Sequence, residues 1–214
     1  MSDSINPDKS VIKNYAILIV GLFIMSFGVS LSVKSNLGTT PISCIPNVIS
    51  FASTLSLGMI TIIFNALLIL IQILILRKNF PRVQYLQLLV TVIFGYFIDL
   101  TLWILNGLVL TTYIDQWIVC IISCFVIAFG VLLEVKSNAI VLPGEGVSLA
   151  IRHVTNIEFG KLKTLFDTSN VVIGAALSLI LFGTFKGVGL GTIFAAIAVG
   201  YIVRFYKGIL DKFI

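Results

Sequence analysis

Long apolar stretches separated by short polar ones make up most of this chain, and six of them reach the length of a membrane-spanning helix. They cover about residues 13–33, 58–76, 85–105, 117–135, 165–181 and 188–205. A helix needs roughly 20 apolar residues to cross the hydrocarbon core of a bilayer. Continuous apolar runs of this length are not the alternating strands of a barrel, so the pattern predicts an all-α polytopic membrane protein with six transmembrane helices.

The first apolar stretch occurs twice in the chain. Residues 23–36, FIMSFGVSLSVKSN, align with residues 125–138, FVIAFGVLLEVKSN, at a constant offset of 102. The same offset pairs Pro41 with Pro143, Gly58 with Gly160 and Asn65 with Asp167; after a small insertion, an offset of 105 pairs Gly95 with Gly200 and Asp99 with Arg204. We therefore divide the chain into a cytoplasmic N-terminal tail (1–12), a first three-span repeat (13–107) and a second three-span repeat (117–210).

An odd number of spans in each repeat makes the second repeat enter the membrane from the opposite side, so the repeats are predicted to be inverted. With both termini in the cytoplasm, twelve of the 14 Lys and Arg residues fall on the cytoplasmic side, and only Lys34 and Lys186 fall outside. This bias follows the positive-inside rule. Inverted repeats recur in secondary transporters, whose solute sites lie near the bilayer midplane where the repeats meet.

Composition and charge narrow the classes of protein that fit. Hydrophobic residues make up 58% of the chain and charged residues 11%, and the mean hydropathy is +1.13, whereas soluble domains carry about 25% charged residues. The net charge of +5 comes from bases beside the apolar segments, which indicates membrane topology and no nucleic-acid partner. Cys44, Cys120 and Cys124 lack metal-ligand spacing with the single His153, so we expect buried thiols, no metal site and no cofactor.

A segment too short to span the membrane follows the first span of each repeat. In the first repeat Pro41 can begin a short helix after Thr39 or Thr40 as N-cap, and in the second Pro143 takes the same place with Glu145 in the first turn. Two arrangements stay open. The helices are either re-entrant half-helices whose N-termini hold a ligand, or amphipathic helices that lie on the two membrane surfaces.

Polar side chains in and beside these apolar segments are the candidate substrate-binding residues: Asn36, Thr39, Thr40, Ser43, Asn65, Asp99, Asn138, Glu145 and Asp167. A carboxylate as deep as Asp99 costs about 3 kcal/mol by insertion scales, so it should face a polar interior or a partner. Asp167 is either a second functional acid or the partner of Lys163 one turn before it. Glu134, at the end of the fourth span, is expected to be a solvated boundary residue.

Several short motifs resemble those of a known family. They are LGTTPIS at 37–43, SLG followed by IIFN within 56–65, GYFID at 95–99, GLGTI at 189–193 and AVGY at 198–201. On these residues the chain resembles the YitT/YczE/YyaS-type family of small bacterial integral membrane proteins. The resemblance covers nearly all of the membrane part. It implies a multi-pass protein of the bacterial plasma membrane, and it implies no particular substrate.

Three functions fit these observations. The first is a small-solute transporter or permease with a central site between the repeats. The second is the substrate-capturing membrane subunit of an energy-coupling-factor uptake system, and the third is a non-transporting membrane scaffold or regulator. We do not expect an enzyme, because the chain has one histidine, no His-Glu-x-x-His helix and no paired intramembrane aspartates. The expected partners are the lipid bilayer and a small molecule of unknown identity, and a homo-oligomer is compatible with the sequence.

The inverted topology predicts that Lys34 and Lys136, which are equivalent in the two repeats, lie on opposite sides of the membrane. A single cysteine at position 34 should react with an impermeant maleimide on intact cells. A single cysteine at position 136 should react only after the cells are permeabilised. Labelling of both positions from outside intact cells would rule out the inverted arrangement.

Overall fold

The computed structural model describes residues 7–213, with the side chains of residues 11–209, and every element in this part is helical. Six helices are long and apolar enough to cross a membrane, which confirms the predicted number. Residues 1–6 of the predicted tail lie outside the described residues, and helix α1 already begins at Pro7. The α-helices are α1 (Pro7–Lys34), α2 (Pro41–Ala52), α3 (Leu57–Leu76), α4 (Leu86–Ile104), α5 (Tyr113–Ser137), α6 (Pro143–Thr155), α7 (Phe159–Phe182) and α8 (Leu190–Phe213), with short 3-10 turns at Arg77–Asn79, Arg82–Tyr85 and Leu105–Gly107.

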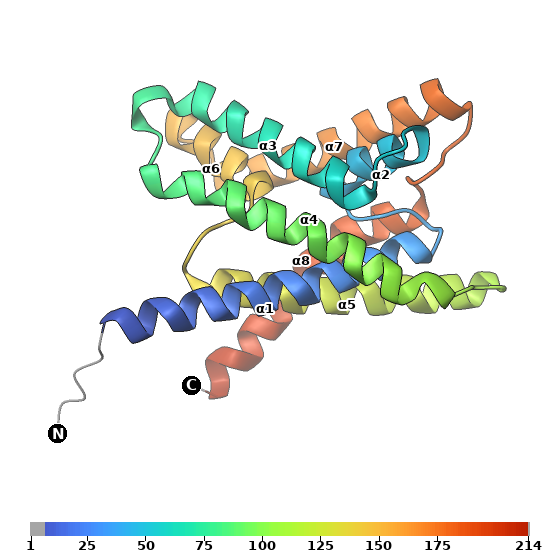
Figure 1. The fold of residues 1–214 in the computed structure, drawn as a ribbon, viewed down its shortest axis with the longest axis horizontal. Coiled ribbons are helices and arrows are strands. Elements are labelled where there is room, and N and C mark those ends of the chain that lie inside the picture. The colour runs from blue at the N-terminus through green and yellow to red at the C-terminus, as the bar shows by residue number, and fades with distance from the viewer. Residues whose placement is uncertain (1–6, 214) are drawn as a thin grey trace.

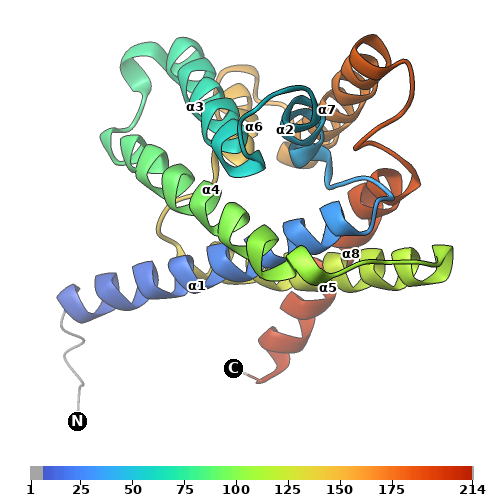
Figure 2. The same ribbon diagram turned by 45° about the vertical axis from the view of Figure 1, so that its right-hand side comes forward.

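The helices form two groups (Figures 1 and 2). Helices α1 and α5 lie side by side, α4 packs on α1, and α8 packs on α5; we call these four the scaffold. Helices α3 and α7 flank the two short helices, with α2 packed mainly on α7 and α6 mainly on α3; we call these four the bundle. Each group therefore contains equivalent helices from both repeats.

The crossing of α1 and α5 is reciprocal. A Cβ atom built on Gly28 would lie 2.5 Å from Ile127 Cγ1, and one built on Gly130 would lie 2.7 Å from Met25 Cβ. Both pairs are equivalent at the offset of 102, so each repeat touches the other through the same positions, as in a two-fold symmetric interface. The contacts also run in opposite directions along the two helices, so the equivalent helices α1 and α5 are antiparallel.

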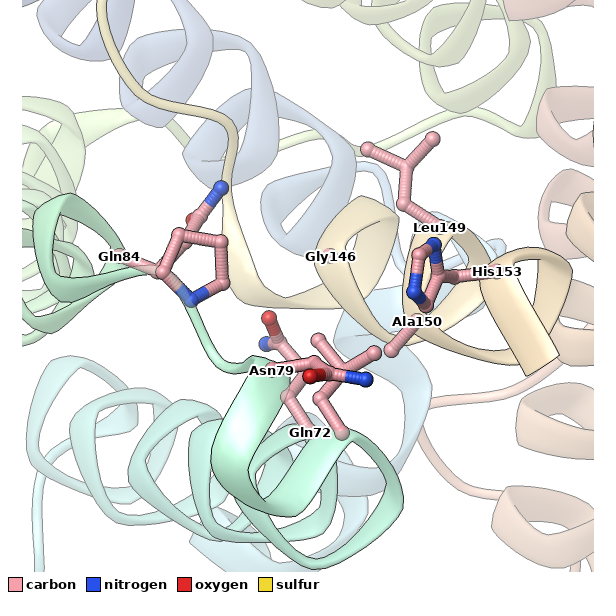
Figure 3. Close-up of a pocket in the computed structure, with 9 residues that line it drawn as sticks. Gln72, Asn79, Gln84, Gly146, Leu149, Ala150 and His153 are labelled. Atoms are coloured by element: carbon pink, nitrogen blue, oxygen red, sulfur yellow. The ribbon is translucent and has the colours of Figure 1, made fainter.

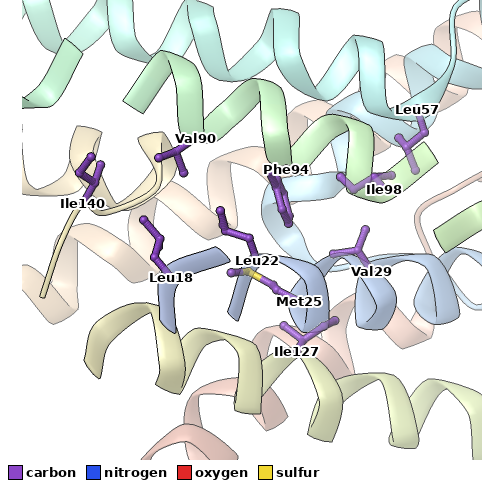
Figure 4. Close-up of a cluster of buried hydrophobic side chains, with 10 residues drawn as sticks. All are labelled: Leu18, Leu22, Met25, Val29, Leu57, Val90, Phe94, Ile98, Ile127 and Ile140. Carbon is purple, nitrogen blue, oxygen red and sulfur yellow. The ribbon is translucent and has the colours of Figure 1, made fainter. Parts of the chain in front are cut away.

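The main hydrophobic core lies between α1, α4 and α5 (Figure 4). Leu18, Leu22, Met25 and Val29 recur at helical spacing on α1 and form one buried face. Val90, Phe94 and Ile98 of α4 cover this face from one side, while Ile127 of α5 covers it from the other. Side-chain packing and close backbone contact hold such an interface together inside a membrane, where lipid tails are as apolar as leucine.

Two short helices begin at the predicted prolines, since Pro41 and Pro143 occupy the first positions of α2 and α6. Both helices are mostly buried in their first two turns and end in exposed residues, 51–52 in α2 and 152–155 in α6. A Cβ atom on Gly144 would collide with the side chain of Ile42, so the two N-termini meet inside the bundle. The structure therefore buries the starts of both short helices in protein, as the re-entrant alternative expects, and it does not place them relative to the membrane surfaces.

The close approach of α1 and α5 predicts that Gly28→Leu destabilises the protein. The new side chain would start 2.8 Å from the Ile127 backbone nitrogen, so the helices must separate. Overpacking of this kind costs about 1–3 kcal/mol, and the melting temperature of the purified protein should fall. Gly208→Leu is the matched control, because no atom of the described residues lies within 4 Å of a Cβ atom there. An equal fall in both variants would contradict the crossing.

Candidate functional site

The N-terminus of α2 has hydrogen-bonding groups that the helix itself does not use. Thr40 is the N-cap, as expected, but its side chain makes no capping bond and instead donates to Ser43 Oγ at 3.0 Å. The hydroxyl of Thr39 is buried and has no partner among the described residues. Pro46 lacks an N–H group, so the Ile42 carbonyl also lacks the donor that normally follows four residues later.

The N-terminus of α6 is held by an acid from α5. Glu134 is only 3% exposed, and its Oε1 accepts a hydrogen bond from Leu142 N at 2.8 Å. The expectation that Glu134 is a solvated boundary residue is therefore wrong, because the chain turns back into the protein after α5 and covers the carboxylate. Its equivalent Ser32 donates to the Gly38 carbonyl at 3.2 Å, so the same position connects the first span to the segment before the short helix in both repeats.

The N-termini of α2 and α6 meet inside the bundle, and we call this place the junction of α2 and α6. Four charged side chains gather beside it, and we call them the charge cluster: Glu134, Glu145, Lys163 and Asp167. Lys163 Nζ lies 2.7 Å from Asp167 Oδ1, so the ion pair that was one of the two alternatives for Asp167 is present. Glu145, in the first turn of α6, interacts electrostatically with Lys163 and Asp167, and also with Glu134. Burial raises the pKa of Glu145, nearby Lys163 opposes the rise, and Asp167 adds to it. The cluster thus contains three acids and one base, and the base is already paired with Asp167.

The equivalent positions of the first repeat carry neutral side chains. Ser43 corresponds to Glu145, Asn65 to Asp167 and Thr61 to Lys163. All three are buried, at 8%, 5% and 7% exposure. Because the repeats are related by the two-fold contacts of α1 and α5, these neutral groups face the junction of α2 and α6 from the opposite side. The junction is therefore polar but uncharged on one side and acidic on the other.

Asn36 and Asn138, which were also predicted to bind substrate, are exposed residues that end helices. Both have positive φ angles, 56° and 51°, in the left-handed region that asparagine tolerates better than most residues. Just before them, Ser35 Oγ donates to Ser32 O and Ser137 Oγ donates to Glu134 O, each at 2.6 Å. The repeated Ser-Asn sequence thus forms the same turn in both halves.

Asp99 is bound to the start of α3. Its Oδ2 accepts from Ser56 Oγ at 2.6 Å, and its Oδ1 accepts from Gly58 N at 2.8 Å. The carboxylate therefore occupies the positive end of a helix, where an anion is stabilised. This N-terminus is the partner that a carboxylate at such depth requires.

Sequence reasoning missed two buried glutamines that support α6. Gln72 Nε2 donates to Gln87 Oε1 at 3.1 Å and to the Pro143 carbonyl at 3.2 Å, and Gln87 donates to Gln84. Their signal was present, since each is a strongly polar residue in a predicted apolar span. Gln72 also borders a cavity of about 200 Å³ that reaches Gly146 in the first turn of α6 (Figure 3).

The three cysteines are free and buried, as expected. Burial raises the pKa of the Cys44 thiol to about 11, so this cysteine stays protonated and unreactive near neutral pH. In the part of the chain that the structure describes, no group of three His, Cys, Asp or Glu side chains is arranged to hold a metal ion.

The chain belongs to the family described as a family of unknown function, DUF6198, which matches residues 12–208. It is 29% identical to the uncharacterized protein YyaS of Bacillus subtilis, over 90% of this chain and 92% of YyaS. It is 28% identical to the uncharacterized membrane protein YczE of the same organism, over 92% and 86% of the two chains, and 24% identical to an uncharacterized protein of Haemophilus influenzae, over 94% and 86%. No solved structure matches the chain. The predicted YitT/YczE/YyaS-type membrane family is confirmed.

The contacts of Asp99 predict a loss of stability when its carboxylate is removed. Asp99→Ala leaves Ser56 Oγ and Gly58 N without their acceptor, and loss of a helix-capping group costs about 0.5–2 kcal/mol. The melting temperature should fall. Asp99→Asn keeps one acceptor oxygen and should recover part of the loss. If both variants melt at the parent temperature, Asp99 does not cap α3.

Proposed function

We propose that this protein is a small-solute transporter whose substrate binds where the N-termini of α2 and α6 meet. The observation that carries the proposal is this junction, in which two buried half-helices begin face to face beside the charge cluster. Secondary transporters bind solutes in this way, with the ends of broken helices pointing at a site between inverted repeats. The polytopic helical fold and the antiparallel packing of α1 on α5 support the same reading.

Access to the junction differs between its two sides. The side chains of Lys163 and Asp167 are 30% and 23% exposed, whereas their equivalents Thr61 and Asn65 are buried at 7% and 5% exposure. The protein thus covers Lys163 and Asp167 less completely than it covers Thr61 and Asn65. A transporter needs a site that opens on one side at a time, and this asymmetry supports that class over a scaffold.

The charges favour a solute with a cationic group. Asp167 is paired with Lys163, and Glu134 holds the Leu142 N–H group. Glu145 has no hydrogen bond or ion pair among the side chains that the structure describes, so its carboxylate is the group left to bind a cation. The free Thr39 hydroxyl and the α2 N-terminus can bind a hydrogen-bond acceptor. Small amines and zwitterions carrying both features fit this arrangement.

The proposal predicts that Glu145→Gln weakens solute binding without unfolding the protein. A thermal-shift screen of amines and amino acids on the purified protein should identify a solute that raises the melting temperature. Loss of one charged hydrogen bond, about 1.5–3 kcal/mol, should weaken the binding of that solute by about tenfold or more in Glu145→Gln. Glu145→Asp keeps the charge and should retain more affinity.

Uptake into proteoliposomes then separates transport from capture. Uptake by the purified protein alone supports a transporter, whereas tight binding without uptake supports a capture subunit that needs partner proteins. If no amine or zwitterion binds, or if Glu145→Gln binds the solute as well as the parent does, the proposed site is wrong.

The raised pKa of Glu145 predicts that binding of a cationic solute depends on pH. Only the deprotonated carboxylate attracts a cation, and a raised pKa moves its protonation above the usual value for glutamate, about 4.3. Affinity should therefore be highest above the raised pKa and should fall as the pH is lowered through it. Titrations of the parent and of Glu145→Gln across mildly acidic pH measure this dependence, which the variant should lack.

A further inference from the structure

The junction between α3 and α4 is closed by glycines and a polar contact. A Cβ atom on Gly58 would collide with the Gly95 carbonyl, and the Cβ atom of any larger residue at Gly95 would meet Gly58 and Ile62. Next to this contact, Ser56 Oγ and Gly58 N donate to Asp99. The start of α3 is therefore fixed to the end of α4.

The equivalent junction of the second repeat is open. The residues that correspond to Gly58 and Gly95 are Gly160 and Gly200; a Cβ atom on Gly160 would lie 3.7 Å from Glu158 Oε1, and no described atom lies within 4 Å of one on Gly200. Helix α7 has no interface with α8 comparable to that of α3 with α4, and the two helices diverge in Figure 2. The first turn of α8 is tied to the bundle side by a hydrogen bond from Gly191 N to the Leu37 carbonyl at 2.8 Å. The gap therefore widens toward the end of α8.

The open junction retains the groups needed to close it. Gly200 lies in the interior of α8, where glycine costs about 1 kcal/mol relative to alanine, and Gly160 lies in the first turn of α7. In the open form neither makes a close contact with the described residues of other elements. The polar pair is retained as opposite charges: Glu158 takes the place of Ser56 as the N-cap of α7, and Arg204 takes the place of Asp99. Both are exposed, and neither forms an ion pair among the side chains that the structure describes; Arg204 lies over the ring of Tyr201, 5.9 Å from its centroid.

We infer that the bundle rocks on the scaffold between two conformations, of which this structure is one. In the other conformation Gly160 packs on Gly200, Glu158 pairs with Arg204, and the junction of α3 with α4 opens. Because the two junctions are equivalent under the two-fold relation, the second conformation reuses contacts already seen in the first. This inference extends the proposed transport function, and the role of the motion in transport rests on that proposal.

Closure would also change access to the charge cluster. In the closed first repeat, Thr61 and Asn65 are buried, and in the open second repeat their equivalents Lys163 and Asp167 are partly exposed. Closing α7 on α8 would cover Lys163 and Asp167, and opening α3 from α4 would uncover Thr61 and Asn65. The solute site would then face the opposite side of the membrane.

Two cysteine pairs test the inference, in a variant whose Cys44, Cys120 and Cys124 are replaced by alanine. Ile62→Cys with Gly95→Cys spans the closed junction, and the equivalent pair Thr164→Cys with Gly200→Cys spans the open one. Disulfides need Cβ atoms about 3.5–4.5 Å apart. We expect oxidation by copper phenanthroline in membranes to cross-link both pairs. Cross-linking of the first pair alone, in the presence and absence of sodium or candidate solutes, would overturn the inference.

A charge test asks whether Glu158 and Arg204 form the closing contact. In the Thr164/Gly200 cysteine pair, Arg204→Gln should slow cross-linking, while Lys207→Gln, a matched neutralisation one turn further along α8, should not. Glu158→Arg combined with Arg204→Glu should restore the rate. If Lys207→Gln slows cross-linking as much as Arg204→Gln does, the ion pair is not the closing contact.

These measurements separate the inference from the proposed function, because cross-linking needs no transported solute. If both cysteine pairs cross-link but the protein transports no solute, the proposed motion is supported and the proposed transport function is rejected. If the protein takes up a solute but the Thr164/Gly200 cysteine pair never cross-links, the proposed transport function is supported and the proposed motion is rejected.

Discussion

The reciprocal crossing of α1 and α5 is the contact on which the rest of the structure depends. Gly28 and Gly130 let two long helices approach until backbone meets backbone, and the equivalence of their partners imposes a two-fold relation on everything attached to them. Helices α4 and α8 take equivalent places beside this pair. The two short helices must then arrive from opposite directions, and for that reason their N-termini meet.

Much of the fold could be predicted from the sequence, because inside a membrane each apolar stretch must satisfy its own backbone. This constraint gave the six spans, and the missing N–H group of proline gave the start of α2 and α6. The match between residues 23–36 and 125–138 gave the repeat, although the sequence did not show that its last residues form the same turn in both copies.

The site was harder to predict, because burial and partners depend on where the chain returns after each helix. Glu134 lies at the end of an apolar span, two residues before Lys136, which predicted a solvated side chain, yet the segment after Asn138 folds over it. Asp99 was predicted as a substrate-binding acid, and the sequence did not show that it accepts hydrogen bonds from the start of α3. Gln72 and Gln87 are separated by a loop, and only the packing of α3 on α4 brings them together under Pro143.

The neutral and charged sides of the junction carry a consequence for how such a protein can be assembled. If the two repeats were separate, identical chains that formed a dimer, every substitution would be made in both. An acid at the position of Glu145 would then also be present at the equivalent position, where this chain has Ser43. Two carboxylates at one junction repel each other and favour protonation of one of them. Joining both copies in a single chain removes that coupling: Ser43 and Asn65 stay neutral while Glu145 and Asp167 carry charge. Covalent linkage of the two repeats thus permits equivalent positions to differ in charge, which exact two-fold symmetry forbids.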